Sequence, residues 1–161
     1  MHSTPNNPAT LLENIYHFRR LSEQLATAGQ PTAEQFSWIA QAGFEVVINL
    51  ALASGERTLA DEPGIVHALG MAYIHIPVVW ESPQLADLDL FIKTMDQQAG
   101  QNVFLHCTAN LRVSAFMALY QLAKQELSAD QARTEAQHFW QFNPTWETFF
   151  EEAICSLASL A

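Results

Sequence analysis

The chain has 161 residues, a formal net charge of −10 from 7 basic and 17 acidic side chains, and a hydrophobic content of 49%. That apolar content argues against a disordered chain, and the length suits one domain with a substantial core. Nucleic acids and anionic membranes are poor candidates as partners because they require clustered lysine and arginine, whereas one arginine with several backbone amides can still bind a small anion.

Residues 1–9 are rich in proline and asparagine, and we predict that they are disordered while residues 10–161 form a single domain. The N-terminus has neither the basic nor the apolar segment of a secretion signal, and no apolar run approaches the roughly 18–20 residues of a membrane span. The two cysteines, Cys107 and Cys155, form no Cys-x-x-Cys pair, which argues against a disulfide framework. We therefore expect a cytoplasmic protein.

The first part of the chain already mixes helix and strand signals. A short helix is expected over 10–15 and a strand over 23–27. Thr32 and Gln35 have the spacing of a capping box, which predicts the start of a helix. Gly43 suits the position just after the end of that helix.

Hydrophobic periodicity predicts a regular alternation of strands and helices after Gly43. The run FEVVINL at 44–50 is almost continuously apolar, which is typical of a strand buried on both faces of a parallel sheet. The further elements expected are strands over 72–78 and 102–106, and helices over 61–69, 85–98, 114–127, 129–142 and 146–160. This order predicts a three-layer α/β domain, in which helices flank a small, mainly parallel sheet of four to five strands. Ligands bind beyond the carboxyl ends of strands in such sheets, and Cys107 stands at one of these ends.

The stretch LHCTANLRVS, residues 105–114, places a cysteine between a predicted strand and a predicted helix. A helix N-terminus directs amide groups and a partial positive charge towards one point, which stabilises a bound anion and a thiolate alike. Arg112 adds a planar fork of donors, and Asn110 tolerates the positive φ that such a turn requires. The residues expected to bind phosphate are Thr108, Ala109, Asn110, Leu111 and Arg112.

These groups suit nucleophilic chemistry. Cys107 would attack, Arg112 and the amides would bind the oxyanion, and the Ser114 hydroxyl would donate to the thiolate when it leaves. The alternative is that Cys107 is a small buried hydrophobic residue, as free cysteines in protein cores often are. Cys155 lies on an apolar helix and is interpreted as such a core residue.

The segment HCTANLRVS resembles the phosphate-binding loop of cysteine-dependent protein tyrosine and dual-specificity phosphatases. In that family a strand ends in His-Cys, and a glycine usually stands where Asn110 stands here. Three further segments resemble a small bacterial phosphatase-like group that is also found joined to β-lactamase-like hydrolase domains: SEQLATAGQPTAEQF (22–36), AGFEVVINL (42–50) and GMAYIHIPV (70–78). The resemblance implies a tyrosine-phosphatase-like fold and hydrolysis of a phosphoprotein or small phosphate ester through a Cys107 phosphocysteine. It also implies that His106 orients the loop.

The loop departs from that family in its spacing. Four residues separate Cys107 from Arg112 where the family has five, and Val113 stands in the usual place of the arginine. One residue fewer removes up to about 3.5 Å of chain. The shorter spacing resembles that of rhodanese-type sulfurtransferases, in which the cysteine carries a persulfide sulfur. The alternatives to a phosphatase are therefore a sulfurtransferase that uses Cys107, a pseudophosphatase that binds phosphate without turnover, and a structural protein.

The resembled phosphatases use a carboxylic acid, on a loop after the preceding strand, to protonate the leaving oxygen. Glu81 is the first carboxylate of that loop here and is our candidate, with Asp87 and Asp89 as alternatives. The other interpretation is that the acid is absent and that Trp80 only walls the pocket. Arg57, in the loop after strand 44–50, is a candidate contact for a substrate anion.

We expect no metal and no cofactor, because the histidines at 17, 67 and 138 form no metal-ligand spacing with cysteines or carboxylates. The expected partner is a phosphorylated substrate or another small oxyanion, and the oligomeric state is left open. The aromatic segment HFWQFNPTWETFF at 138–150 is interpreted as core cover for the sheet, with an exposed dimer patch as the alternative.

Overall fold

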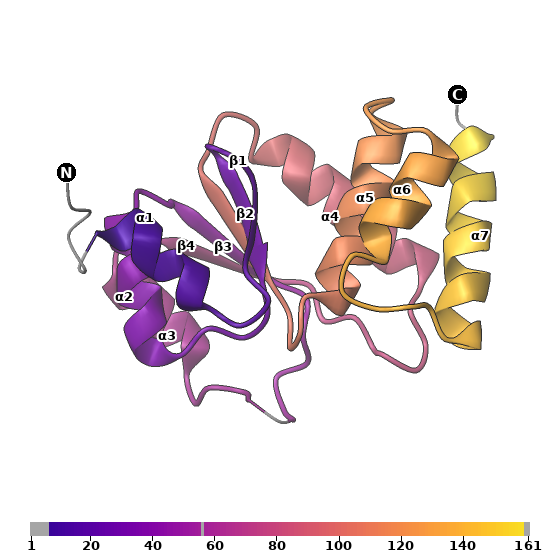
Figure 1. Ribbon diagram of the computed structural model, residues 1–161. Coiled ribbons are helices and arrows are strands. Elements are labelled where there is room, and N and C mark those ends of the chain that lie inside the picture. Colours follow the sequence, from indigo (N-terminus) through magenta and orange to yellow (C-terminus); the bar gives the residue numbers. More distant parts are fainter. Residues whose placement is uncertain (1–6, 56, 160–161) are drawn as a thin grey trace.

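One five-stranded sheet organises the computed structural model, which describes residues 7–55 and 57–159 (Figure 1). The strands are β1 (Arg19–Ser22), β2 (Leu25–Ala28), β3 (Val46–Asn49), β4 (Ala72–His75) and β5 (Val103–His106). Their spatial order is β1-β2-β5-β3-β4, with β1 antiparallel to β2 and every other neighbouring pair parallel. The predicted small, mainly parallel sheet is confirmed.

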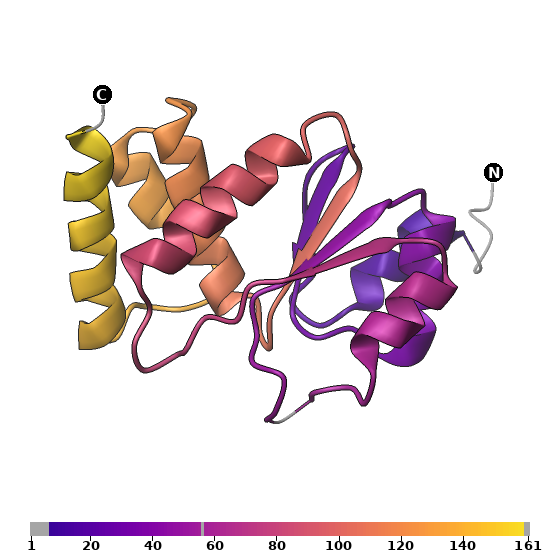
Figure 2. The ribbon, with the colours of Figure 1, turned by 180° about the vertical axis from the view of Figure 1, so that it is seen from behind.

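Helices cover both faces of the sheet, as the two opposite views show (Figures 1 and 2). One face carries α1 (Pro8–Leu11), the 3₁₀ turn η1 (Leu12–Asn14), α2 (Ala33–Gln41) and α3 (Glu62–Ala68). The other carries α4 (Leu85–Gln97), α5 (Leu111–Ala123), α6 (Ala129–Ala136) and α7 (Pro144–Ala158). The three-layer α/β architecture is therefore confirmed. None of the helices within residues 7–55 and 57–159 has the length and apolar character needed to cross a membrane.

Local sequence signals explain where several helices begin and end. The capping box of Thr32 and Gln35 is present at the start of α2, and Gly43 follows that helix with φ of 97°. Asn143 caps α7, and Pro144 fills its first position, where a missing amide proton costs nothing. The start of α2 and the glycine that follows it therefore match the prediction, whereas α7 begins two residues before the expected position 146.

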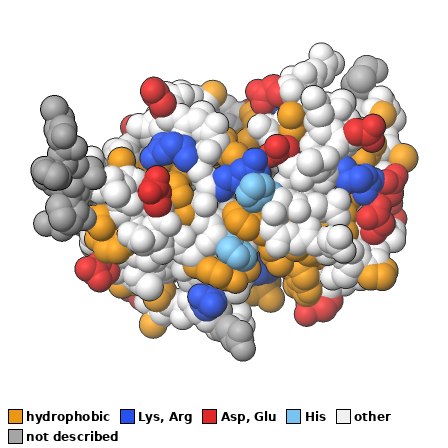
Figure 3. All heavy atoms as spheres, in the orientation of Figure 1, with side chains coloured by type: hydrophobic (Ala, Val, Ile, Leu, Met, Phe, Trp, Pro, Cys, Tyr) orange, Lys and Arg blue, Asp and Glu red, His pale blue; other side chains and the backbone are white. Residues whose placement is uncertain are grey.

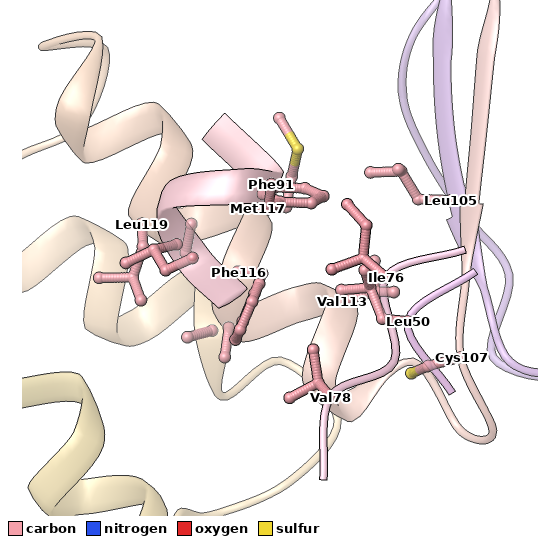
Figure 4. Packing of buried hydrophobic residues seen from close by; sticks show 14 of the residues in the cluster. Leu50, Ile76, Val78, Phe91, Leu105, Cys107, Val113, Phe116, Met117 and Leu119 are labelled. Carbon is pink, nitrogen blue, oxygen red and sulfur yellow. The ribbon is translucent and has the colours of Figure 1, made fainter. Parts of the chain in front are cut away.

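Alternation along the strands divides the core into two clusters. In β5, Leu105 packs on the α4–α7 side and Phe104 on the α1–α3 side. Cys107, the residue after β5, joins the α4–α7 cluster, where Figure 4 shows it at the edge near Leu50 and Val78. His106 therefore points to the opposite face from Cys107, as strand alternation predicts.

The helix α5 is buried almost all round, because it lies between the sheet and the outer helices α6 and α7 (Figures 1 and 2). The aromatic segment of α7 packs inwards: Trp146 and Phe150 are fully buried and Phe149 is 4% exposed. The interpretation of 138–150 as core cover therefore fits these side chains.

Several element boundaries differ from the expectations. Strand β1 was not predicted, because Arg19–Ser22 lacks apolar alternation and it pairs only as an antiparallel edge strand. The helix expected from residue 114 begins at Leu111, and the helix expected over 129–142 ends at Ala136. The earlier start of α5 bears on the site, because it makes Arg112 a helical residue.

Two further expectations need correction. The segment 1–9 was predicted to be disordered, but α1 begins at Pro8 and the Asn7 side chain accepts a hydrogen bond from the Ala9 amide at 3.0 Å. Residues 1–6 of that segment lie outside the described residues. Cys155 was interpreted as core, but it is exposed, because it faces away from the buried stripe of α7. The single domain over 10–161 stays a prediction.

Candidate active site

The loop from Cys107 to Asn110 connects β5 to α5 and is anchored by its neighbours. The Gln30 amide donates to the Thr108 carbonyl at 3.0 Å, and the Cys107 amide donates to the Ala28 carbonyl at 3.4 Å. On its outer side, the Ala109 carbonyl lies 2.8 Å from Nδ1 of His17. The shape of this loop is therefore set by the ends of the adjacent parallel strands and by the segment before β1.

Asn110 shapes the turn into α5. Its φ is 64°, the positive value expected from the sequence. Its side-chain amide donates to the carbonyl of His17 at 2.9 Å and to Oγ1 of Thr27 at 3.0 Å. These bonds use the side chain within the protein, so Asn110 supports the loop through structure.

The Ser114 hydroxyl lies within the same turn. It donates to the backbone carbonyl of Asn110 at 2.6 Å, and its oxygen lies 3.2 Å from Oδ1 of that residue. Among the described residues, no hydrogen bond joins this hydroxyl to the sulfur of Cys107. The structure therefore does not bring Ser114 and the thiol together as the sequence led us to expect.

A small pocket lies over this loop. Its volume is about 230 Å³, and its lining residues are Trp80, Cys107, Thr108, Ala109, Leu111 and Arg112. The N-cap of α5 makes no side-chain cap bond, and no acceptor within residues 7–55 and 57–159 is found for the amides of Thr108, Ala109, Leu111 and Arg112. Unpaired amides at the positive end of a 13-residue helix favour an anion.

Arg112 supplies the positive charge of the pocket. Its side chain is buried at 8% exposure, with Nη1 donating to the Val78 carbonyl at 2.9 Å and Nη2 to Oγ1 of Thr108 at 3.0 Å. No carboxylate in the described part of the chain pairs with it. A guanidinium carries five N–H donors, so donors remain for a ligand. Because an isolated buried charge is costly, an anion in this pocket would be stabilised.

Val113, which stands in the usual place of the arginine, lies outside the pocket. Its side chain is fully buried in the α4–α7 cluster (Figure 4). The preceding residue, Arg112, lines the pocket. The helix begins early enough to direct the arginine, and not the valine, towards Cys107. The four-residue spacing thus brings nucleophile candidate and cation to one pocket.

A buried hydrogen-bonded pair, His106 and Glu62, lies on the other side of the loop. Nε2 of His106 is 2.7 Å from Oε2 of Glu62, and Nδ1 of His106 is 3.2 Å from the Cys107 carbonyl. Gln30 donates to Oε1 of the same carboxylate at 2.7 Å. Burial acts to raise the pKa of Glu62, but the hydrogen bond and charge of His106 and the donors of Gln30 and Tyr73 outweigh it and hold that pKa below its ordinary value.

Sequence reasoning found His106 but missed Glu62. The two residues are 44 positions apart, and Glu62 begins a short helix, where an acidic residue is ordinary. The available signal was that α3 starts at the same carboxyl edge of the sheet at which β5 ends.

The carboxylates proposed as general acids lie outside the pocket lining. Glu81 is exposed in the turn after Trp80, whose carbonyl accepts a hydrogen bond from Nε1 of Trp146 at 2.9 Å. Asp87 lies in the first turn of α4, where burial raises its pKa against the effect of a backbone hydrogen bond. Asp89 lines a different cavity, of about 740 Å³, between α4, α5, α6 and α7. The structure therefore brings no described carboxylate to the lining of the Cys107 pocket.

Aromatic side chains contact His17, whose ring nitrogen bonds to the loop at Ala109. On the face of the molecule drawn in Figure 3, histidine and hydrophobic side chains gather near the centre. The His17 ring stacks between those of Tyr16 and Phe139, with ring centroids 4.1 Å and 4.4 Å away. The guanidinium of Arg57 lies 4.2 Å from the centre of the Tyr16 ring. Arg57 is thus stacked on an aromatic side chain and is absent from the pocket lining.

Known proteins similar to this chain include phosphatase domains, in agreement with the geometry of the pocket. Residues 14–151 match the family described as "DSP-PTPase phosphatase fused to NAD+ Kinase". The Beta-lactamase hydrolase-like proteins of two Xylella fastidiosa strains, Temecula1 and 9a5c, are 28% identical over 117 residues. That match covers 69% of this chain but 26% of theirs, so the chain spans about a quarter of the length of these curated relatives.

Solved structures share both fold and sequence features with the chain. A DUF442 protein from Shewanella putrefaciens CN-32 is 37% identical, with a TM-score of 0.81 over 91% of this chain and 96% of that one. Tk-PTP has the same fold at 16% identity, with a TM-score of 0.73 over 86% of this chain and 96% of its own. The resemblance noted in the sequence is therefore confirmed, and the chain belongs to the family of tyrosine and dual-specificity phosphatase domains described as fused to NAD+ kinase.

Proposed function

We propose that the protein hydrolyses phosphate monoesters, of a phosphoprotein or of a small molecule, through a phosphocysteine at Cys107. The Cys107 thiolate attacks phosphorus, an S–P bond forms, and the P–O bond to the leaving group breaks. Water then attacks the phosphocysteine, the S–P bond breaks, and inorganic phosphate leaves as the thiolate is restored. Arg112 and the loop amides bind the phosphoryl oxygens throughout.

One observation carries this proposal: a buried guanidinium that pairs with no carboxylate of the described residues lies in the same small pocket as a cysteine and several amides. Within residues 7–55 and 57–159 these amides have no acceptor. Each of these groups favours negative charge at one point, and a phosphoryl group with a thiolate beside it supplies that charge. The family match supports phosphate esters as the substrate class.

The leaving oxygen needs a proton, and Glu81 is the proposed donor because it directly follows the pocket residue Trp80. Its exposed position means that the turn would have to move towards the bound substrate. Esters with good leaving groups, such as aryl phosphates, depend little on such a donor. We therefore expect aryl phosphates to be hydrolysed faster than alkyl phosphates, and Glu81→Gln to affect alkyl phosphates more.

The test is hydrolysis of p-nitrophenyl phosphate by the full chain. Cys107→Ser should abolish turnover, whereas Cys155→Ser, which replaces the other free cysteine on the surface of α7, should not alter it. Rapid quenching followed by mass spectrometry should find one phosphoryl group on the peptide that contains Cys107. Turnover that survives Cys107→Ser would contradict the proposal.

Two further assays on the same protein distinguish the other two functions that the loop permits. Sulfur transfer from thiosulfate to cyanide that depends on Cys107, without phosphatase turnover, would identify a sulfurtransferase. Binding of inorganic phosphate without either reaction would identify a pseudophosphatase.

Both cysteines of the chain are free, which supports a reducing compartment such as the cytoplasm.

A further inference from the structure

We propose that Glu62 is a positioning residue that keeps His106 protonated on both ring nitrogens, so that a buried imidazolium lies behind the Cys107 loop. The charge state and its effect on the thiol can be tested without any turnover. Only the effect on hydrolysis rests on the proposed function.

Each ring nitrogen of His106 faces a hydrogen-bond acceptor. Nε2 is 2.7 Å from a carboxylate oxygen of Glu62, and Nδ1 is 3.2 Å from the carbonyl oxygen of Cys107. A carbonyl and an ionised carboxylate both accept hydrogen bonds and cannot donate. Both ring nitrogens therefore need a proton, and an imidazole with two N–H groups is positively charged.

The Glu62 carboxylate is itself surrounded by donors. Its Oε1 accepts from Nε2 of Gln30 at 2.7 Å, and its Oε2 faces Nε2 of His106 at 2.7 Å. A carboxylate that accepts several bonds is stabilised in its charged form. Because Gln30 also donates to this carboxylate, the alternative in which a neutral Glu62 donates its proton to a neutral His106 is disfavoured.

No second charged group competes for His106 among the described residues that surround it. The edge of the Phe36 ring from α2 packs against the imidazole, with centroids 5.8 Å apart. Tyr73 from β4 is neutral, since burial raises its pKa to about 12, and it accepts a bond from Asn49 of β3 at 3.0 Å. With His106 fully buried and Glu62 4% exposed, solvent cannot replace this pairing.

The pair reaches the nucleophile through the backbone. Nδ1–H donates to the carbonyl of Cys107 itself, while the sulfur lies on the opposite face of the strand end. An imidazolium at this position adds positive potential under a loop that must hold a thiolate and a phosphoryl group. The positive end of the Glu62–His106 pair lies nearer the loop than the negative end, so the net effect favours an anion there.

The first experiment reads the charge of His106 directly in the wild-type protein. Long-range ¹H–¹⁵N spectra at neutral pH, with the His106 signals assigned from a His106→Gln variant, should give the pattern of an imidazolium. Glu62→Gln should convert these signals to those of a single neutral tautomer, and the exposed-carboxylate control Glu34→Gln should leave them unchanged. A neutral His106 in the wild type would overturn the proposal, and this reading needs no Glu62 variant to fold.

The second experiment measures the thiol. In a Cys155→Ser background, alkylation of Cys107 by iodoacetamide at pH 7 should be about tenfold slower in Glu62→Gln, the factor that a one-unit displacement of the pH profile produces. The profile should move to higher pH while its plateau stays the same, which a merely structural loss would not produce. Equal profiles in folded Glu62→Gln and wild type would overturn the proposal. Absence of phosphatase turnover would leave both readings intact, because neither uses a phosphate ester.

Discussion

Gly29, at the end of β2, touches the Cys107 loop so closely that one methyl group would displace it. A Cβ built at this position would lie 2.8 Å from the Thr108 carbonyl oxygen and 2.7 Å from Cδ2 of Tyr16. Optimal separations between such atoms are about 3.5–4.0 Å, so Gly29→Ala requires a displacement of about 1 Å. Overpacking of this kind costs about 1–3 kcal/mol, and the reduced entropy of the unfolded chain offsets about 0.4–1 kcal/mol of it.

The expected net loss of stability is about 1–2 kcal/mol, or about 2–8 °C in melting temperature for a domain of this size. Because Thr108 lies in the pocket, the same displacement should lower kcat/KM for an aryl phosphate by up to about a hundredfold. Calorimetry and p-nitrophenyl phosphate hydrolysis measure the two effects. Gly43→Ala is the matched control: its φ of 97° makes alanine strained but no atom lies within 4 Å, so it should lose stability and keep activity. Wild-type stability and activity in Gly29→Ala would refute this reasoning.

Three further substitutions test other parts of the site. Arg112→Lys replaces a guanidinium, which also donates to the Val78 carbonyl, with the point charge of an ammonium group. Phosphate affinity measured by titration calorimetry should fall about tenfold to a hundredfold. Unchanged affinity would mean that the anion binds elsewhere. Asn110→Ala loses the two hydrogen bonds that the side-chain amide donates and forces alanine to positive φ, so urea unfolding should report a loss of about 2–4 kcal/mol. A loss below about 1 kcal/mol would contradict the role assigned to Asn110. Burial opposes the effect, but His106 lowers the pKa of Glu62 below 4.5, so wild type should be more stable than Glu62→Gln above pH 4.5. That difference in stability should vanish as pH falls through the pKa of Glu62 in the folded protein. A constant difference in urea midpoint between pH 7 and pH 3 would argue against the ion pair.

The parts of this protein that sequence could predict are those that depend on near neighbours in the chain. The capping box of Thr32 and Gln35 and the apolar run of β3 both express local rules, and each lies where it was expected. Strand β1 was missed because its pairing with β2, and not its own composition, makes it a strand.

The parts that could not be predicted depend on contacts distant in sequence. Glu62 meets His106 only because α3 begins at the same edge of the sheet at which β5 ends, and nothing near either residue specifies that meeting. Ser114 was expected to face the thiol from its sequence distance alone, but the early start of α5 turns its hydroxyl onto Asn110. Which of two adjacent residues enters a pocket depends on the residue at which a helix begins, and sequence patterns define that point poorly.

The bond from Trp146 to the Trp80 carbonyl links the pocket to α7, the last helix in the chain. During synthesis, Cys107 and Arg112 emerge well before that helix does. A nascent chain that has made the nucleophile but not α7 would still lack the support for one wall of its pocket. The proposed hydrolase activity would then arrive late, together with completion of the outer layer. Partly made or C-terminally clipped molecules would show little of that activity even though they contain Cys107 and Arg112.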